Sequence, residues 1–236
     1  MFKLNSPLAL KTGLEALTRV HGARQITTTF RGKTASTDYK NINLPALPMT
    51  AELSKNELAI FRGYHGHEVG HILYTKKNQY NDFVDRNFSI TNLDNPTEKI
   101  SPLYMNRASV EKHEEYRIAV RKMHTFHRIW NFLEDPMIEK KLIKRFAGLH
   151  VALNATIESV VRGSNDARRN GARNEADYDP RETLCFAFNL HNRLLIDIGG
   201  KEVEEYLSNL PSDIEPLFQS LKKEMSSVGS TLAACK

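Results

Sequence analysis

Apolar residues first recur at the spacing of a helix. Leu10, Leu14 and Leu17 lie three or four positions apart, so they share one face of a helix. Ser6 is a residue type that caps helix starts, and Gly22 is one that follows helix ends. The chain is therefore expected to begin with a helix that ends near Gly22 and turns its leucines to the core.

β-Branched residues then replace the helical periodicity. They run through residues 26–29 and through a threonine-rich stretch at 34–37, and Ile42 and Leu44 follow after a group of turn formers. Pro45 ends the last run because proline cannot donate a hydrogen bond to a neighbouring strand. This pattern predicts a small antiparallel sheet.

Helical signals return at Ser54. Ser54 and Glu57 have the spacing of a capping box, in which each side chain bonds the backbone N–H of the other residue. This spacing predicts a helix that continues to about Thr75. Residues 76–104 have weak periodicity and many turn formers, which predicts a loop or short pieces of structure.

A long helical pattern starts near Ala108 and continues to about Gly148. An interruption is expected at Pro136, because proline lacks the backbone N–H that a helix uses. Four further helices are predicted over residues 150–163, 180–196, 200–208 and 212–226. The turn-forming and charged residues near 163–180 predict a flexible linker.

Composition fits a globular protein, since 40% of the residues are hydrophobic and 26% are charged. The expected fold is α+β and mostly helical, with one domain at 1–148 and a helical extension at 149–236. No stretch is long and apolar enough to cross a bilayer or to serve as a secretory signal, so a cytoplasmic protein without a membrane partner is expected. Cys185 and Cys235 form no CxxC pair, so a metal site would have to use histidines and carboxylates.

The formal net charge is +5, from 33 Lys and Arg against 28 Asp and Glu. This mild excess permits an acidic partner without demanding one. A nucleic-acid-binding function would rest on this charge and on Arg168, Arg169 and Arg173. Acidic residues interrupt these arginines, so a solvated loop is the better interpretation of the segment.

The stretch GYHGHEVGHILYT, residues 63–75, carries the pattern H-E-x-x-H at His67, Glu68 and His71. Histidines four positions apart lie on one face of a helix, so both imidazoles can bind one ion. Glu68 can then take a proton from water at the open coordination position. The alternative is a hydrogen-bonded histidine cluster on a structural helix. His65 lies two positions before His67 and points to another face, so it is expected to pack or to support the site.

A catalytic zinc usually takes three protein ligands, so the third has to come from elsewhere in the chain. The segment HTFHRIWNFLEDPMIEKKL places His127, Asn131 and Glu134 on one helical face, with Asp135 and Glu139 on the adjacent one. Glu134 could complete the site while Asp135 or Asn131 orients a histidine. The proline that follows could instead make Asp135 the cap of a new helix, so Glu134 and Asp135 compete for the ligand role. A solvated acidic face that balances the nearby lysines is the other interpretation.

Three blocks in one order resemble the zincin-type metallopeptidase-like region of the cobaltochelatase T-subunit family and of related von Willebrand A-associated proteins of bacteria and phages. The blocks are TASTDYKNINLPAL, HEVGHILYT and WNFLEDPMIE, and the resemblance covers roughly residues 25–145. The matching residues are Ala35, Thr37, Asp38, Ile42, Leu44, Pro45, His67, Glu68, His71, Tyr74, Thr75, Asn131, Glu134, Asp135 and Glu139. The resemblance implies a zincin-like core with an HExxH helix and a second ligand helix. No D-x-S-x-S metal-adhesion motif follows in this sequence.

The resemblance implies a zinc-dependent metallopeptidase acting on a peptide or protein. Zn²⁺ would be bound by His67, His71 and Glu134, with Glu68 as the general base. Zincin folds also place substrate beside an edge strand, which would give the segment ending at Leu44 a binding role. The alternative is a non-catalytic zincin-like module that acts as the partner of an AAA-type ATPase in a chelatase-like complex, or as a phage accessory factor.

Three further side chains near these blocks could donate a hydrogen bond to a developing oxyanion. They are Tyr64, Tyr74 and His127. Tyrosines beside such helices also serve as core residues, so both roles stay open.

Overall fold

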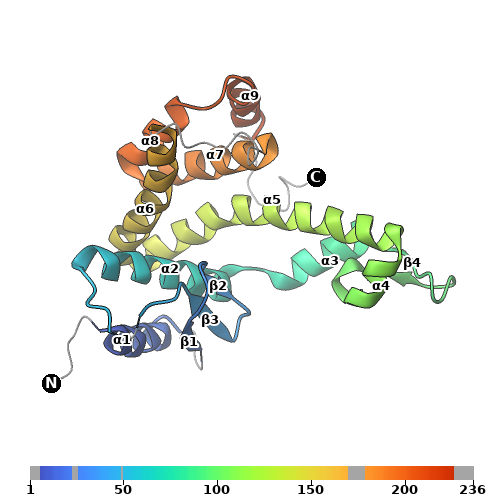
Figure 1. The fold of residues 1–236 in the computed structure, drawn as a ribbon, viewed down its shortest axis with the longest axis horizontal. Helices are drawn as coiled ribbons and strands as arrows, with labels where there is room; N and C mark the ends of the chain where they lie inside the picture. The colour runs from blue at the N-terminus through green and yellow to red at the C-terminus, as the bar shows by residue number, and fades with distance from the viewer. Residues whose placement is uncertain (1–5, 23–25, 49, 170–178, 226–236) are drawn as a thin grey trace. The chain divides into compact units, whose positions relative to one another are not determined.

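The structure is a computed structural model that describes residues 6–22, 26–48, 50–169 and 179–225. These residues are mostly helical and form two small sheets, which confirms the α+β, mostly helical class (Figure 1). Within these ranges, every helix is too short or too polar to cross a membrane.

The chain divides into two compact units. Of the described residues, the first contains those up to 75 and those from 134 onward, and the second contains residues 76–133. The HExxH motif and the acidic pair Glu134 and Asp135 all belong to the first unit.

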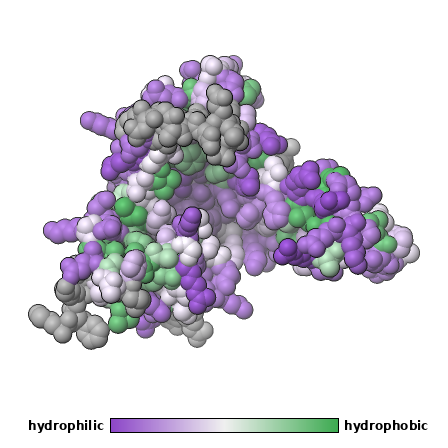
Figure 2. All heavy atoms as spheres, in the orientation of Figure 1, coloured by the Kyte–Doolittle hydropathy of each residue, from purple (hydrophilic) through white to green (hydrophobic). Residues whose placement is uncertain are grey.

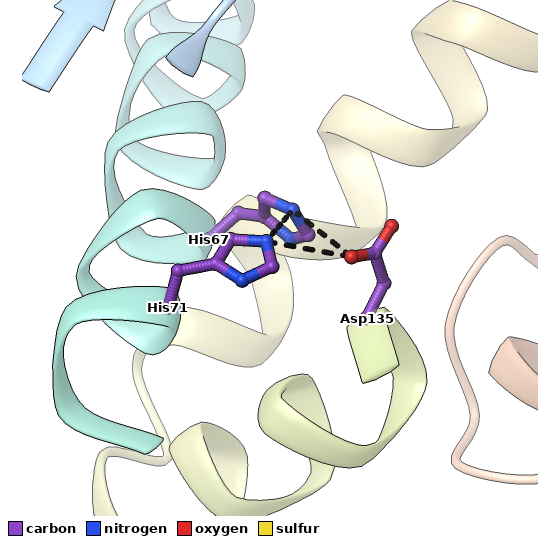
Figure 3. A group of neighbouring side chains, drawn as sticks. All are labelled: His67, His71 and Asp135. Atoms are coloured by element: carbon purple, nitrogen blue, oxygen red, sulfur yellow. Dashed lines mark hydrogen bonds and ion pairs between the residues drawn. The ribbon is translucent and has the colours of Figure 1, made fainter. Parts of the chain in front are cut away.

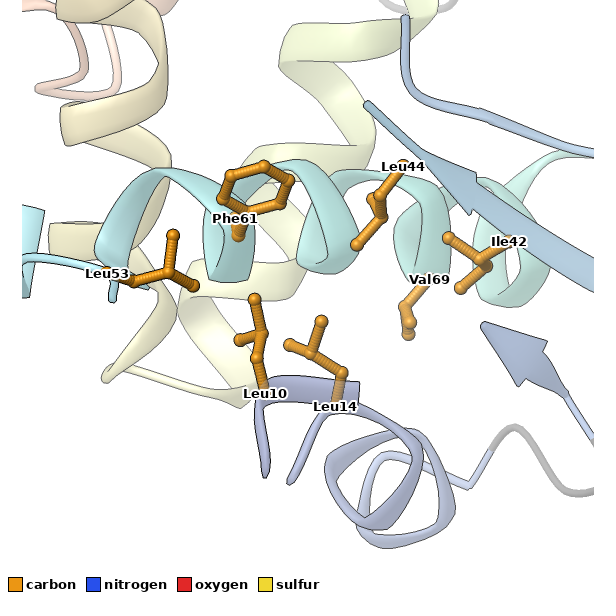
Figure 4. Packing of buried hydrophobic residues seen from close by; sticks show 7 residues of the cluster. All are labelled: Leu10, Leu14, Ile42, Leu44, Leu53, Phe61 and Val69. Carbon is orange, nitrogen blue, oxygen red and sulfur yellow. The ribbon is translucent and has the colours of Figure 1, made fainter. Parts of the chain in front are cut away.

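Helix α1, Pro7–Val20, forms as its capping residues indicate. Ser6 Oγ accepts a hydrogen bond of 3.3 Å from the backbone N–H of Ala9, and Gly22 follows the helix with φ at 91°. The leucines of α1 pack in the core of the first unit against the sheet and helix α2, Lys55–Tyr74 (Figure 4). The buried members of this core are Leu10, Leu14, Ile42, Leu44, Leu53, Phe61 and Val69.

A three-stranded sheet follows, with strand order β1-β3-β2. The strands are β1, Thr27–Phe30; β2, Ser36–Thr37; and β3, Asn41–Leu44. Strands β2 and β3 are antiparallel, but β1 and β3 are parallel, with Thr28 opposite Ile42. The prediction of a purely antiparallel sheet is therefore wrong. Gly32, with φ at 69°, turns the chain after β1, so β2 forms on the far side and β3 returns between the two.

Strand β3 is the central strand of this sheet. The binding role expected for the segment ending at Leu44 requires a free strand edge. Strand β3 does not offer such an edge, because β1 and β2 pair with it on its two sides. The free edges of the described sheet belong to β1 and β2.

Helix α2, Lys55–Tyr74, carries the HExxH motif and has the predicted bounds. Ser54 Oγ accepts a hydrogen bond of 3.2 Å from the N–H of Glu57, and Glu57 Oε2 accepts one of 2.8 Å from the N–H of Ser54. The capping box is therefore complete, and it fixes where the helix begins.

Helix α6, Leu149–Arg169, packs along α2. A Cβ atom on Gly63 of α2 would collide with the Thr156 hydroxyl and the Ala152 carbonyl of α6. The Thr156 hydroxyl also lies 2.9 Å from the carbonyl of Ile60 in α2. The two helices can lie this close only because position 63 has no side chain.

Helix α5, Glu114–Arg145, continues through Pro136, so the predicted interruption there is wrong. The break lies earlier, at His113, whose extended backbone separates α5 from helix α4, Arg107–Lys112. Proline keeps a helical φ and removes only one backbone donor, so the buried flanks of this helix can hold it in register. Residues before and after Pro136 therefore stay on one continuous helical surface.

Three more helices belong to the first unit: α7, Pro180–Leu194; α8, Gly200–Ser208; and α9, Glu215–Met225. Their bounds are close to the predicted ranges. Helix α6 continues to Arg169, past the predicted end at residue 163. Residues 170–178 of the predicted linker, with Arg173, lie outside the described residues.

The second unit contains helix α3, Lys77–Phe88, where a loop or short pieces had been expected, and that part of the prediction is wrong. Helix α3 packs against aromatic residues of α5 through Tyr80, Phe83 and Val84, and this packing favours the helix. The many polar residues of the segment hide its helical pattern in the sequence. The unit also contains β4, Ile90–Thr91; β5, Lys99–Ile100; the 3-10 helix η1, Pro102–Tyr104; α4; and the first part of α5.

Candidate metal centre

Two histidines of α2 and one aspartate of α5 point at each other (Figure 3). The Nε2 atoms of His67 and His71 lie 3.2 Å apart. Asp135 Oδ1 lies 3.7 Å from the Nε2 of His67 and 3.4 Å from the Nε2 of His71. Tetrahedral zinc with ligand bonds of about 2.0–2.1 Å holds its ligand atoms about 3.3 Å apart. The three atoms therefore have the spacing of one face of a zinc coordination tetrahedron.

The other ring nitrogen of His67 is held by a buried carboxylate. His67 Nδ1 lies 2.8 Å from Glu139 Oε1, and the Glu139 side chain is fully buried. Arg193 of α7 donates to both oxygens of Glu139, at 2.8 and 2.7 Å. Because an ionised carboxylate only accepts hydrogen bonds, the proton of a neutral His67 is on Nδ1. Its Nε2 lone pair is then free to face Asp135.

The other ring nitrogen of His71 is held by a hydroxyl. Thr75 Oγ1 lies 3.0 Å from His71 Nδ1 and donates to Glu134 Oε2 at 3.0 Å. A hydroxyl has one proton, so Thr75 accepts a hydrogen bond from His71 Nδ1–H. Glu134 lies on this side of the ring, 3.5 Å from Nδ1, and not on the side that faces Asp135.

With neutral histidines in these tautomers, the lone pairs of His67 Nε2, His71 Nε2 and Asp135 Oδ1 point toward the same place. Asp135 Oδ1 is buried and accepts no hydrogen bond of good geometry from any described residue. Lone pairs at such distances repel one another unless a metal ion or an additional proton lies between them. Burial alone would lower the pKa of His71, but the carboxylates of Asp135 and Glu134 raise this pKa to about 10. The arrangement therefore favours a cation at this point.

Glu68, between the two histidines in sequence, is 6% exposed. Burial raises the pKa of its carboxyl group, and the nearby charges of His67 and His71 partly oppose that rise. A carboxyl group with a raised pKa exchanges protons closer to neutral pH, as a general base must.

Tyr39 reaches the same region from the turn between β2 and β3, and the sequence did not identify it. Its hydroxyl is hydrogen-bonded to the Thr75 side chain, and burial and the charges of Glu134 and Glu68 raise its pKa. Its φ of 71° lies in the left-handed region, which costs an aromatic residue about 1–3 kcal/mol. Thr37 Oγ1 accepts a hydrogen bond of 3.0 Å from its N–H and supports that conformation. The fold thus keeps a protonated phenol near Glu68.

Arg193 is the second residue of this region that the sequence did not identify. It is 5% exposed, and one of its terminal nitrogens lies 3.6 Å from Asp135 Oδ2. A hydrogen bond to the Asn189 side chain holds it from within the same helix. A charged residue on the apolar face of FAFNLHNRLL was the signal available in the sequence, because a charge in such a position needs a partner.

The histidine next to the motif has a structural role, as expected. His65 is 1% exposed, and its Nε2 lies 2.9 Å from Thr18 Oγ1 of α1. The Thr18 hydroxyl donates to the Leu14 carbonyl at 2.9 Å, so it accepts from His65. His65 therefore joins α2 to α1.

Other candidate residues lie elsewhere. Asn131 and the exposed His127 belong to the second unit and are hydrogen-bonded to each other at 3.3 Å. The Tyr74 ring lies 5.7 Å from Lys141 Nζ, and Tyr64 packs against Phe61 in the core. None of these contacts assigns an oxyanion-donating role.

The candidate centre therefore consists of two nitrogen donors and one oxygen donor, each set in place by a neighbour. Asp135 supplies the oxygen atom of this group, while Glu134 and Glu139 lie on the Nδ1 sides of the histidines. Comparison of the chain with protein-family models, with curated proteins and with solved structures gave no match.

Proposed function

We propose that this protein is a zinc-dependent metallohydrolase that cleaves peptide bonds. The observation that carries the proposal is the convergence of His67 Nε2, His71 Nε2 and Asp135 Oδ1, each with its lone pair toward the same point. Structural zinc sites use four protein ligands, whereas catalytic sites use three and leave one position open. Three converging donors fit the catalytic kind.

Asp135 is the third ligand in this proposal, in preference to Glu134. Glu134 already accepts the Thr75 hydroxyl and lies nearest to a His71 nitrogen that carries a proton. Asp135 lies within 3.7 Å of the Nε2 atoms of both histidines, on the side away from Glu134 and Glu139. Glu134 then acts through Thr75 and keeps the His71 ring in orientation.

Zinc is the metal that the donor set fits best. Imidazole nitrogen and carboxylate oxygen are common zinc ligands, and calcium or magnesium sites are built from oxygen atoms. The spacing of the donors, from 3.2 to 3.7 Å, suits bonds of about 2.0–2.1 Å. Zinc bound here would supply Lewis acidity toward water and toward the carbonyl of the scissile bond.

The chain's own groups supply the proton transfers. Glu68 takes the proton of the attacking water and passes it to the leaving amine. The Tyr39 hydroxyl turns its proton from Thr75 to the carbonyl oxygen as negative charge develops on that oxygen. Glu139 and Thr75 hold the imidazoles throughout, so the donors need not reorganise.

The edge of β2 supports a peptide substrate. Ser36 and Thr37 form the strand that runs directly into the Tyr39 turn, and β2 pairs with β3 on one side only in the described sheet. An extended peptide added to that edge would bring its backbone carbonyls toward the tyrosine.

The test combines elemental analysis with a cleavage assay on a quenched fluorescent peptide library. The purified chain is expected to contain one zinc ion, and Glu68→Gln is expected to keep the zinc and to lose cleavage. A chain without any stoichiometric transition metal contradicts the proposal. If His67→Ala loses zinc and fold while neither the wild type nor Glu68→Gln cleaves any peptide, the site is that of a non-catalytic zincin-like module.

A further inference from the structure

A pocket of about 550 Å³ lies in the first unit, between α1, α2 and the junction of α5 with α6. Its lining contains none of the metal-centre residues. The walls are mainly apolar, with Leu10, Leu14, Leu17 and Leu58 among them. Pockets of roughly 300–1,000 Å³ with such walls typically hold small molecules.

Hydrophobic residues, drawn green and pale green, lie among hydrophilic ones on the surface in the region of α1 (Figure 2). Leu8 and Val20 of this helix are 48% and 75% exposed.

Gly13 leaves open space in one wall. It lies in the middle of α1 and lines the pocket, and a Cβ atom on it would meet no atom within 4 Å. Gly63 and Gly70 of α2 differ, because a Cβ atom there would collide with a neighbouring helix. The glycine in α1 weakens the helix without being needed for close packing, and it enlarges the pocket.

His21 contributes a ring to this apolar lining. The residue is 5% exposed, and its ring packs on Phe146 at an interplanar angle of 36°, with ring centroids 4.1 Å apart. Both rings line the pocket. Its Nδ1 has no hydrogen-bond partner among the described residues and almost no accessible surface, so a molecule in the pocket meets the ring and not this nitrogen.

The charges near His21 are positive. Arg62 of α2 lines the pocket, and the charge of Arg145 acts on His21. None of the described lining residues is acidic. This polarity attracts an anion to the polar end of the pocket.

We propose that this pocket binds a small amphipathic carboxylate, which is an apolar chain or ring that carries one carboxylate group. The apolar part lies among the leucines and over Gly13. The carboxylate accepts hydrogen bonds from the Arg62 guanidinium. The proposal does not depend on the metal centre.

Calorimetric titration with decanoate, kept below its micelle concentration, tests the proposal. Decan-1-ol is the matched probe, because it has the same chain without the charge. Decanoate is expected to bind one site per chain about tenfold more tightly than the alcohol, since charge-assisted hydrogen bonds are stronger than neutral ones. Absence of decanoate binding, or equal affinity for the two probes, overturns the proposal.

Gly13→Leu locates the binding site. The leucine side chain extends into the pocket without removing a contact, so binding of both probes is expected to fall at least about tenfold as the apolar volume is filled. Gly163→Leu is the control, because Gly163 of α6 also has open space around its Cβ position and lies outside the pocket lining. Decanoate affinity that is unchanged in Gly13→Leu places the binding elsewhere and refutes the assignment.

Two variants test the polar end. Arg62→Gln is expected to reduce decanoate affinity about three- to tenfold and to leave decan-1-ol affinity nearly unchanged. His21→Phe is expected to leave both affinities nearly unchanged, because His21 Nδ1 is closed to the pocket and phenylalanine keeps a ring that packs against Phe146. Equal losses for the two probes would mean that no carboxylate is recognised here.

Discussion

At the residue scale, proton placement separates the roles of adjacent carboxylates. Asp135 faces the two Nε2 atoms, whereas Glu134 and Glu139 lie on the Nδ1 sides of the rings. Helical spacing alone could place all three near the histidines, and it could not show which nitrogen each one faces. Only the tertiary contacts of Thr75 and Arg193 reveal the tautomers, and those contacts have no signature in the motif.

Asp135→Asn and Glu134→Gln are therefore expected to differ. Loss of a partner behind a metal-binding histidine typically lowers metal affinity about 10- to 100-fold, so Glu134→Gln should fall in that range. Asp135→Asn should exceed it, because a ligand charge is lost. Competition with a chromophoric chelator measures both zinc affinities. A larger loss in Glu134→Gln than in Asp135→Asn would return the ligand role to Glu134.

Tyr39→Phe tests the oxyanion role of the phenol. Removal of one oxyanion donor typically lowers kcat about 10²- to 10³-fold, and zinc content should stay the same because Tyr39 is not a ligand. Tyr74→Phe is the matched control, since the Tyr74 ring lies beside Lys141. If Tyr39→Phe raises only KM, the tyrosine binds substrate without acting on the developing charge.

His21 gives stability a pH dependence. Burial, and then the charge of Arg145, lower its pKa below the 6.5 of an unperturbed histidine. Between these two pKa values the unfolded chain binds more protons than the folded chain, so stability falls as pH drops below 6.5. His21→Phe should show a smaller loss of unfolding free energy over this range in urea titrations. Identical slopes for the two proteins would contradict the assignment.

At the element scale, local signals predicted helices best. The starts of α1 and α2 depend on caps within three residues of each other, so the sequence contains the whole cause. The parallel pairing of β1 with β3 and the helix through Pro136 depend on packing between distant segments, and they were predicted wrongly. Helix α3 was missed for the same reason, because its aromatic face is recognisable only beside α5.

The close contact of α2 with α6 predicts that alanine has opposite effects on stability at Gly63 and at Gly13. Gly63→Ala should destabilise the fold by about 1–3 kcal/mol, the usual cost of overpacking, because the added methyl group meets backbone and hydroxyl atoms of α6. Gly13→Ala should instead stabilise it by about 0.5–1 kcal/mol, because its Cβ atom is in open space and alanine favours a helix. Denaturant unfolding measures both changes. Similar effects of the two substitutions would show that α2 and α6 are not in close contact.

At the scale of the whole chain, the C-terminal helices belong to the unit that carries the candidate metal centre. The described residues from 134 onward, outside the second unit, cluster with those up to residue 75, and the boundary expected at residue 148 falls inside this unit. Arg193 is the link at the site, because it pairs with the carboxylate that orients His67. The resemblance to zincin-type proteins stops near residue 145, so it could not predict a contribution from α7.

Substitutions at Arg193 and Glu139 allow the effects on stability and on metal binding to be measured separately. Arg193→Met leaves Glu139 buried without its cation and should cost about 3–5 kcal/mol of unfolding free energy. Adding Glu139→Gln removes the unpaired charge, so the double variant should recover most of that stability. Its zinc affinity should nevertheless stay about 10- to 100-fold below wild type, because His67 has lost its carboxylate partner. Denaturant unfolding of the metal-free proteins and chelator competition measure the two quantities. Recovery of both in the double variant would mean that Glu139 only balances the charge of Arg193 and does not orient His67.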